Sequence, residues 1–70
     1  MLKNGEWECA VMNDPDDIEK LCVDILYKDE TALFIRQKGA ERIITVYEKD
    51  IDIPFDWFFE AMQVANNRVS

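Results

Sequence analysis

Hydrophobic and polar residues alternate near the start of the chain, and this pattern predicts a β-strand at residues 6–12. Trp7, Cys9 and Val11 fall on one face of that strand, with acidic residues on the other face. The strand is expected to end at residues 13–15, where Asn-Asp-Pro is typical of a turn.

Two later segments show the same alternation, at residues 31–38 and 42–48. The second of them is rich in β-branched residues, which favour strands because their stiff side chains pack well on a pleated surface. Gly39-Ala40 lies between the two segments as a short turn, so the pattern predicts a β-hairpin.

The C-terminal part of the chain changes to a helical period from Pro54 onwards. One face of the predicted helix carries Phe55, Phe58, Phe59, Met62, Ala65 and Val69. A second stripe on its flank carries Trp57, Ala61 and Val64. The larger stripe is expected to pack on the sheet.

Residues 15–28 fit two patterns. A helical stripe runs through them, Asp14 suits a helix N-cap, and Pro15 suits the first helical position. Val23, Ile25 and Tyr27 also alternate as in a strand. The local pattern taken alone leans towards the helix.

A resemblance bears on this choice. The stretch VDILYKDETALFIRQKG at residues 23–39 and the later DWFFEAM at residues 56–62 resemble a group of small bacterial proteins, some of which look like immunity proteins that neutralise toxins. The resemblance implies that residues 21–28 form a strand that turns through Asp29-Glu30. It implies no catalytic residue.

The expected fold is therefore a single α+β domain, residues 1–70, with a four-stranded antiparallel β-meander packed on one C-terminal helix. The alternative is β-α-β-β-α. In the meander, Ile44 and Val46 belong to the strand face that meets the helix. The opposite face would be open and would show Met12, Leu26, Phe34 and Tyr47 among charged residues that include Arg36, Lys38, Asp24 and Glu8.

Charge is the most unusual feature of the composition. The net charge is −7, and residues 1–30 hold nine acids against three bases. Binding to nucleic acid requires Lys and Arg, so a nucleic-acid partner is disfavoured. An acidic surface suits a basic protein, although a charge of this size also serves solubility alone.

Few residues suit catalysis or metal binding. The chain has no His, and Cys9 and Cys22 are too few to hold a metal. No Asp or Glu is expected to lie in an apolar run that would shift its pKa towards that of a general acid or base. We therefore expect no enzyme activity, no cofactor and no metal site. No apolar run approaches the roughly 18 residues of a membrane helix, so the expected location is the cytoplasm.

The remaining hypothesis is binding to another protein. The leading function is an acidic inhibitor, of the immunity or anti-defence type in bacteria or phage, that masks a basic toxin or nucleic-acid-binding enzyme. The alternative is an accessory module that homodimerises through the open sheet face. The expected partner-binding residues are Asp14, Asp16, Asp17, Glu19, Phe34, Tyr47 and Trp57. For Trp57, however, the favoured interpretation is that its side chain folds over the sheet edge and finishes the core.

Overall fold

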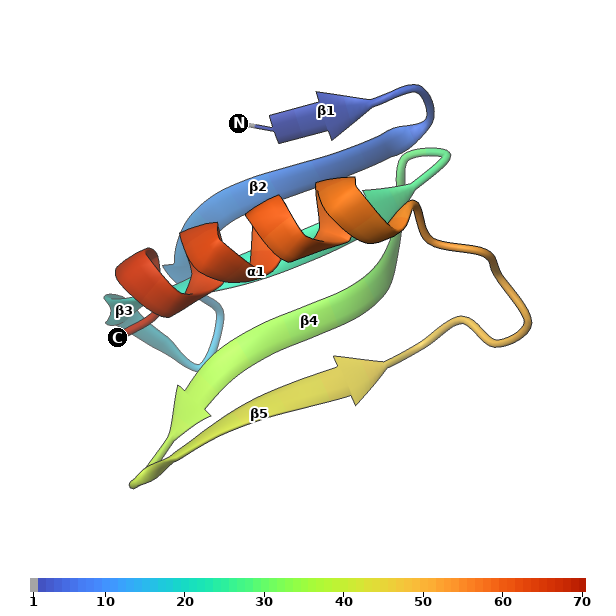
Figure 1. Ribbon diagram of the computed structural model, residues 1–70. Coiled ribbons are helices and arrows are strands. Elements are labelled where there is room, and N and C mark those ends of the chain that lie inside the picture. The colour runs from blue at the N-terminus through green and yellow to red at the C-terminus, as the bar shows by residue number, and fades with distance from the viewer. Residues whose placement is uncertain (1) are drawn as a thin grey trace.

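The computed structural model describes residues 2–70 as two layers, a five-stranded antiparallel sheet with one helix over part of one face (Figure 1). The elements are β1 (Leu2–Asn4), β2 (Trp7–Asp14), β3 (Asp17–Tyr27), β4 (Glu30–Lys38), β5 (Glu41–Val46) and α1 (Phe55–Arg68). Each strand pairs with its neighbour in the sequence. The α+β class and the meander are confirmed, with one strand more than expected.

The additional strand is β1, which pairs with β2 from Leu2 opposite Cys9 to Asn4 opposite Trp7. Three residues are too few to show an alternating pattern, so the local pattern does not predict this strand. Gly5 begins the turn into β2 at a φ of 60°, a left-handed conformation that Gly adopts without steric penalty.

The helical alternative for residues 15–28 is wrong, because β3 occupies most of that segment. Val23 and Ile25 are fully buried between strands: Val11 and Cys9 pair with them from β2, and Ile35 and Leu33 pair with them from β4. This burial on both sides outweighs the local helical pattern. The turn that follows consists of Lys28 and Asp29, at φ values of 52° and 67°, rather than Asp29-Glu30.

Helix α1 packs on β2 and β3 through a face that combines Trp57 and Ala61 of the smaller stripe with Ala65 and Val69 of the larger one, so the predicted packing face was only partly right. Trp57, Ala61 and Ala65 are buried, and the Trp57 ring lies 5.7 Å from that of Trp7. The Trp7 ring in turn lies 4.6 Å from that of Tyr27. The two alanines add little bulk between helix and sheet, which lets the large Trp57 side chain reach the aromatic cluster.

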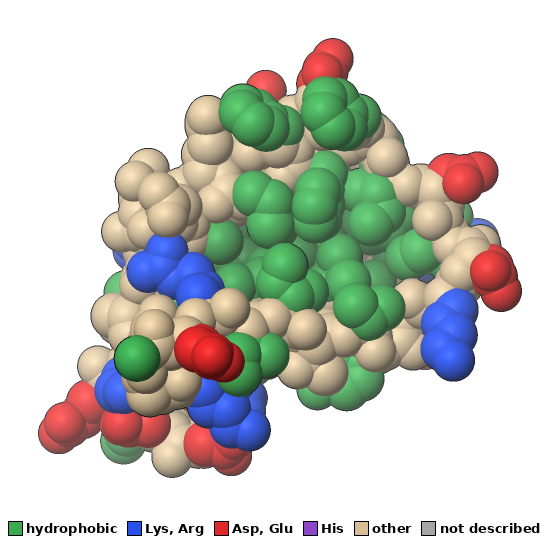
Figure 2. All heavy atoms as spheres, turned by 60° about the horizontal axis from the view of Figure 1, so that its bottom comes forward, with side chains coloured by type: hydrophobic (Ala, Val, Ile, Leu, Met, Phe, Trp, Pro, Cys, Tyr) green, Lys and Arg blue, Asp and Glu red, His purple; other side chains and the backbone are tan. Residues whose placement is uncertain are grey.

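The first half of the larger stripe, which was expected in the core, lies on the flank of the helix instead. Phe58 and Met62 are half-buried, whereas Phe55 is 80% and Phe59 is 58% exposed. Ile44 and Val46 of β5, which were expected to meet the helix, are 49% and 59% exposed. Figure 2 shows hydrophobic side chains gathered over a broad surface here, with charged side chains at its margins.

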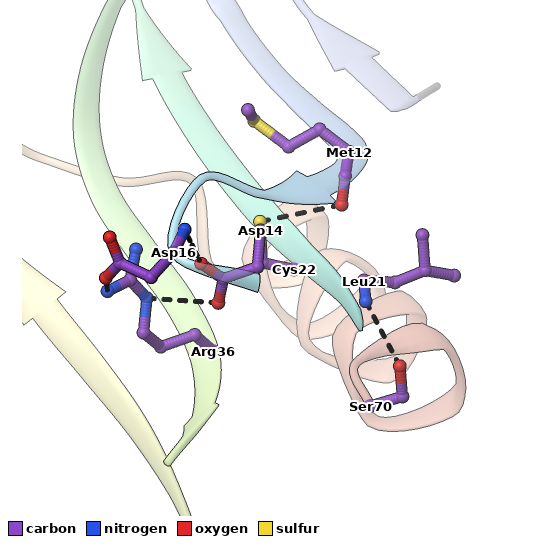
Figure 3. A network of polar contacts seen from close by, with 7 residues as sticks. All are labelled: Met12, Asp14, Asp16, Leu21, Cys22, Arg36 and Ser70. Atoms are coloured by element: carbon purple, nitrogen blue, oxygen red, sulfur yellow. Dashed lines mark hydrogen bonds and ion pairs between the residues drawn. The ribbon is translucent and has the colours of Figure 1, made fainter. Parts of the chain in front are cut away.

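The end of the helix is attached to the sheet by hydrogen bonds at residues far apart in sequence. The Ser70 amide donates to the Leu21 carbonyl at 3.1 Å, and the Leu21 amide donates to the Ser70 hydroxyl at 3.1 Å (Figure 3). Val69 is buried beside them. Over residues 2–70, no helix is both long and apolar enough to span a membrane.

Candidate functional site

The face of the sheet opposite α1 contains a concavity of about 290 Å³. Strands β2, β3 and β4, the β2–β3 turn and the segment after β5 all contribute to it. Its lining residues are Met12, Pro15, Asp24, Thr31, Phe34, Arg36 and Tyr47. The lining therefore combines two aromatic rings with one acid and one base.

Asp24 is the unusual residue of this concavity. It lies on β3, opposite Ala10 of β2 and Phe34 of β4. Its Oδ2 atom accepts a hydrogen bond of 3.1 Å from the Thr31 hydroxyl. Its Oδ1 atom is buried and accepts no hydrogen bond from the residues that the structure describes. A buried carboxylate oxygen without a donor is unfavourable and marks a place where a ligand could supply one.

Burial is the main cause of a raised pKa of the Asp24 carboxyl. The hydrogen bond from Thr31 acts in the opposite direction, and the negative charge of Glu8 raises the pKa slightly further. Within residues 2–70, no cationic side chain is among the causes of the shift in the Asp24 pKa. A positively charged donor bound beside Asp24 would balance the carboxylate charge and supply the hydrogen bond that Oδ1 lacks.

The β2–β3 turn forms one wall of the concavity and is held by Arg36 (Figure 3). Pro15 follows Asp14, where its fixed φ suits the second position of a tight turn. The Asp14 carboxylate closes the turn by accepting the Asp16 amide at 2.9 Å. From β4, Arg36 Nη1 donates to Asp16 Oδ2 at 2.7 Å, and its Nε lies 3.4 Å from Asp14 Oδ2.

Arg36 is therefore committed to its own chain. Its guanidinium lies 4.7 Å from the centre of the Phe34 ring, a cation–π distance. Because Asp14 and Asp16 already pair with Arg36, the one base of the lining, Asp24 is the acid of the lining that has no cationic partner among the described residues.

The structure divides the predicted partner-binding residues among four places. Phe34 and Tyr47 line the concavity, where Tyr47 is 61% exposed, but Phe34 is only 7% exposed, so its expected open position was wrong. Asp14 is only 4% exposed because it is engaged in the turn, and Asp16 is paired with Arg36. Trp57 is buried on the other side of the sheet, so it completes the core.

Asp17 and Glu19 are exposed on β3, and the Glu19 amide donates to Asp17 Oδ1 at 3.2 Å. Asp17 borders a second depression that also contains Lys20 and Lys38. The predicted acidic cluster is consequently interrupted by bases rather than forming one continuous negative surface.

Sequence reasoning missed the role of Asp24. The expectation that no acid sits in an apolar run was wrong, because Asp24 lies within Leu21-Cys22-Val23-Asp24-Ile25-Leu26. An acid in the middle of a run of strand-forming residues was the available signal. Its burial also depends on the β2–β3 turn and on β4, which the run itself does not reveal.

Both cysteines are free and buried. The Cys22 thiol lies on the face opposite the helix and contacts the Met12 carbonyl at 3.5 Å. Burial is the main cause of raised pKa values at Cys9 and Cys22, which keeps both thiols protonated and weakly nucleophilic. Within residues 2–70, no three His, Cys, Asp or Glu side chains are grouped closely enough to hold a metal ion.

No protein-family model, curated protein or solved structure matches this chain.

Proposed function

We propose that this protein binds a basic protein through the concavity opposite α1 and thereby masks the partner's surface. A Lys or Arg side chain of the partner enters between Phe34 and Tyr47 and donates to Asp24. The observation that carries this proposal is the buried Asp24 Oδ1 atom, which has no donor within residues 2–70.

Three further features support a cationic ligand. The net charge of −7 attracts basic proteins and accelerates their encounter. The contact of Arg36 with Phe34 demonstrates that this ring accepts a guanidinium on one face. Tyr47 supplies a second, exposed ring on the same concavity. Aromatic rings next to a carboxylate are a common way to bind a cationic group.

The biological role that fits this activity is neutralisation, as the resemblance to immunity-type proteins implies. The acidic chain would cover a basic surface that its partner needs for its own activity. The alternative, a homodimer through the same open face, receives less support. Such a dimer would bring together two identical Asp24 carboxylates, and like charges repel.

A basic peptide provides the direct test. A tetra-arginine peptide is titrated into the protein while amide chemical shifts are recorded at two salt concentrations. Shifts are expected around Asp24, Thr31 and Phe34, with weaker binding at the higher salt concentration.

The matched variants are Asp24→Asn and Glu19→Gln, because each removes one negative charge from β3. Asp24→Asn should weaken binding at least tenfold, a free-energy change of about 1.4 kcal/mol. Glu19→Gln should weaken binding only slightly. Equal losses in the two variants, or shifts centred elsewhere, would show that the concavity is not the binding site.

A further inference from the structure

The helix leaves an apolar surface beside β5. Arg42 of β5 donates to the Asn66 side chain at 2.9 Å, so the flank of α1 that carries Asn66 faces β5. Residues three and four positions apart share a helix face, which places the same flank at Phe55, Phe58, Phe59 and Met62. Ile44 and Val46 lie across from this flank, and Figure 2 shows the resulting hydrophobic surface.

Strand β5 is also an edge strand whose outer side has no neighbour within residues 2–70. The hairpin partners Lys38 and Glu41 enclose a two-residue turn, and the Tyr47 amide donates to the Ala32 carbonyl of β4 at 2.8 Å. Within β5, odd-numbered residues therefore direct their backbone groups towards β4, whereas beyond the strand the Glu48 amide also donates to the Ala32 carbonyl, at 3.3 Å. By alternation, the amides and carbonyls of Arg42, Ile44 and Val46 point outwards.

The two edges of the sheet are protected differently. Edge strands are usually kept from pairing by being short or charged. β1 has three residues, one of them Lys3, and so meets both conditions. β5 has six residues, and its two charges, Glu41 and Arg42, lie at the hairpin end, so the uncharged run Ile43-Ile44-Thr45-Val46 is left unprotected.

We propose that β5 pairs with β5 of a second copy, antiparallel about a twofold axis at Thr45. The sequence around Thr45 is complementary to itself in this register. Ile44 lies opposite Val46 of the second copy, and Ile43 lies opposite Tyr47. Continued beyond the end of β5 at Val46, the register brings Glu48 opposite Arg42 and Lys49 opposite Glu41. Apart from Thr45, which meets its own copy on the axis, these pairs are either apolar with apolar or acid with base.

This register agrees with the geometry of the edge. The outward backbone groups of Ile44 and Val46 meet as a hydrogen-bonded pair on each side of the axis. Both side chains lie on the helix side of the sheet, so the exposed surfaces of the two copies become continuous. A register with the twofold axis at Ile44 would instead place Arg42 opposite Val46. The favourable pair of opposite charges between Arg42 and Glu48 would then be lost.

Charge also selects this edge for self-association. The protein as a whole is strongly acidic, but residues 31–47 hold three bases against one acid. Two copies therefore meet where their mutual repulsion is smallest. The product is a ten-stranded sheet, five strands from each copy, with both helices on the same side.

Sedimentation over a range of protein concentrations tests the association. The wild-type protein should be a dimer, and Ile44→Lys should be a monomer with an unchanged circular dichroism spectrum. Ile18→Lys is the matched control, because Ile18 is an isoleucine of β3 with 75% exposure, and it should remain a dimer. A monomeric wild type, or a dimer that persists in Ile44→Lys, would overturn the proposal.

Charge reversal tests the register. The variant E41K/E48K makes the margins of the edge entirely basic, and R42E/K49E makes them entirely acidic. Each alone should be a monomer, and a mixture of the two should form a heterodimer. Failure of the mixture to associate would overturn the register even if Ile44→Lys is monomeric. Ile44→Lys should still bind the tetra-arginine peptide, which separates this interface from the concavity.

Discussion

The two faces of the sheet are built on different principles. On the helix side, Trp57, Ala61 and Ala65 pack against Trp7 in a dry layer with no charged side chain among its buried members. On the opposite side, the buried residues include the acid Asp14, and an unpaired oxygen of Asp24 lies beneath the surface. Hydrophobic burial is the dominant favourable term in folding, whereas an uncompensated carboxylate opposes it.

The contacts that stabilise the fold therefore lie on one face of the sheet, and the carboxylate proposed to bind a partner lies on the other. The helix side supplies the contacts that hold the chain together. The opposite side retains an unfavourable group at a place that a ligand can reach, which is common at functional sites. Substitutions on the two faces should consequently change stability in opposite directions.

The largest effect is expected from Trp57→Ala. Removing this ring leaves a cavity against Trp7 and Ala61, and such a change typically lowers the free energy of unfolding by about 3–5 kcal/mol. In a domain of this size that loss approaches complete unfolding. Thermal unfolding followed by circular dichroism measures it.

Trp57→Phe is the informative control. The indole Nε1 of Trp57 is buried without an acceptor within residues 2–70, so Phe removes an unsatisfied donor while keeping most of the ring. Its loss of stability should be well below that of Trp57→Ala. Equal losses in both variants would mean that the ring contacts described here do not hold the helix.

A smaller effect, of the opposite sign, is expected from Asp24→Asn. Burial raises the pKa of Asp24 in the folded protein, so the folded state retains the proton to higher pH than the unfolded chain. Stability from this group is present at low pH and is lost as pH rises through the folded pKa. The Asn variant avoids that loss, so its melting temperature should exceed that of wild type at neutral pH.

The advantage of Asp24→Asn should disappear below pH ~3.9, the usual pKa of Asp in an unfolded chain. Melting curves from acid to neutral pH measure this convergence, with Glu19→Gln as the control for losing one charge from β3. A lower melting temperature for Asp24→Asn at neutral pH would contradict the assignment of Asp24 as an unfavourable group. Asp24→Asn should therefore be more stable than wild type at neutral pH and yet bind the basic peptide more weakly.

The smallest effect is expected from Phe59→Ser on the stability of the monomer. Phe59 is more than half exposed, and substitutions at such positions usually change the free energy of unfolding by less than about 0.5 kcal/mol. Denaturant unfolding in the Ile44→Lys background measures the monomer alone. A loss of several times that size would show that the β5 side of α1 belongs to the core.

The sequence predicted the strands better than it predicted how the layers meet. Alternation placed Cys9 and Val11 on one face of β2, and Val23 and Ile25 on the matching face of β3, as observed. The position of α1 was also predicted. Its rotation was predicted only in part, because a helical wheel ranks the stripe with three Phe residues and one Met above the stripe of Trp57 and Ala61. Which stripe packs depends on the space above Trp7, which is a property of the assembled sheet.

The candidate site was predicted only in part. Alternation assigned Phe34, Tyr47 and Asp24 to the face opposite the helix, and all three line the concavity. The wall that encloses Asp24 requires Arg36 to bind Asp16, a contact between residues 20 positions apart. Nothing in the local pattern of either segment reveals that contact, so the shape of the site could not be derived from it.

The order of the elements has a consequence for synthesis on the ribosome. All five strands precede α1 in the chain, and the closing contact joins residues 49 positions apart, Leu21 and Ser70. At ~5–20 residues per second, the paired strands wait for their cover on the order of seconds. Throughout that interval the face around Val23 and Ile25 is open to solvent. Because like charges repel, the excess of acids in residues 1–30 opposes the association of two such exposed faces during that interval.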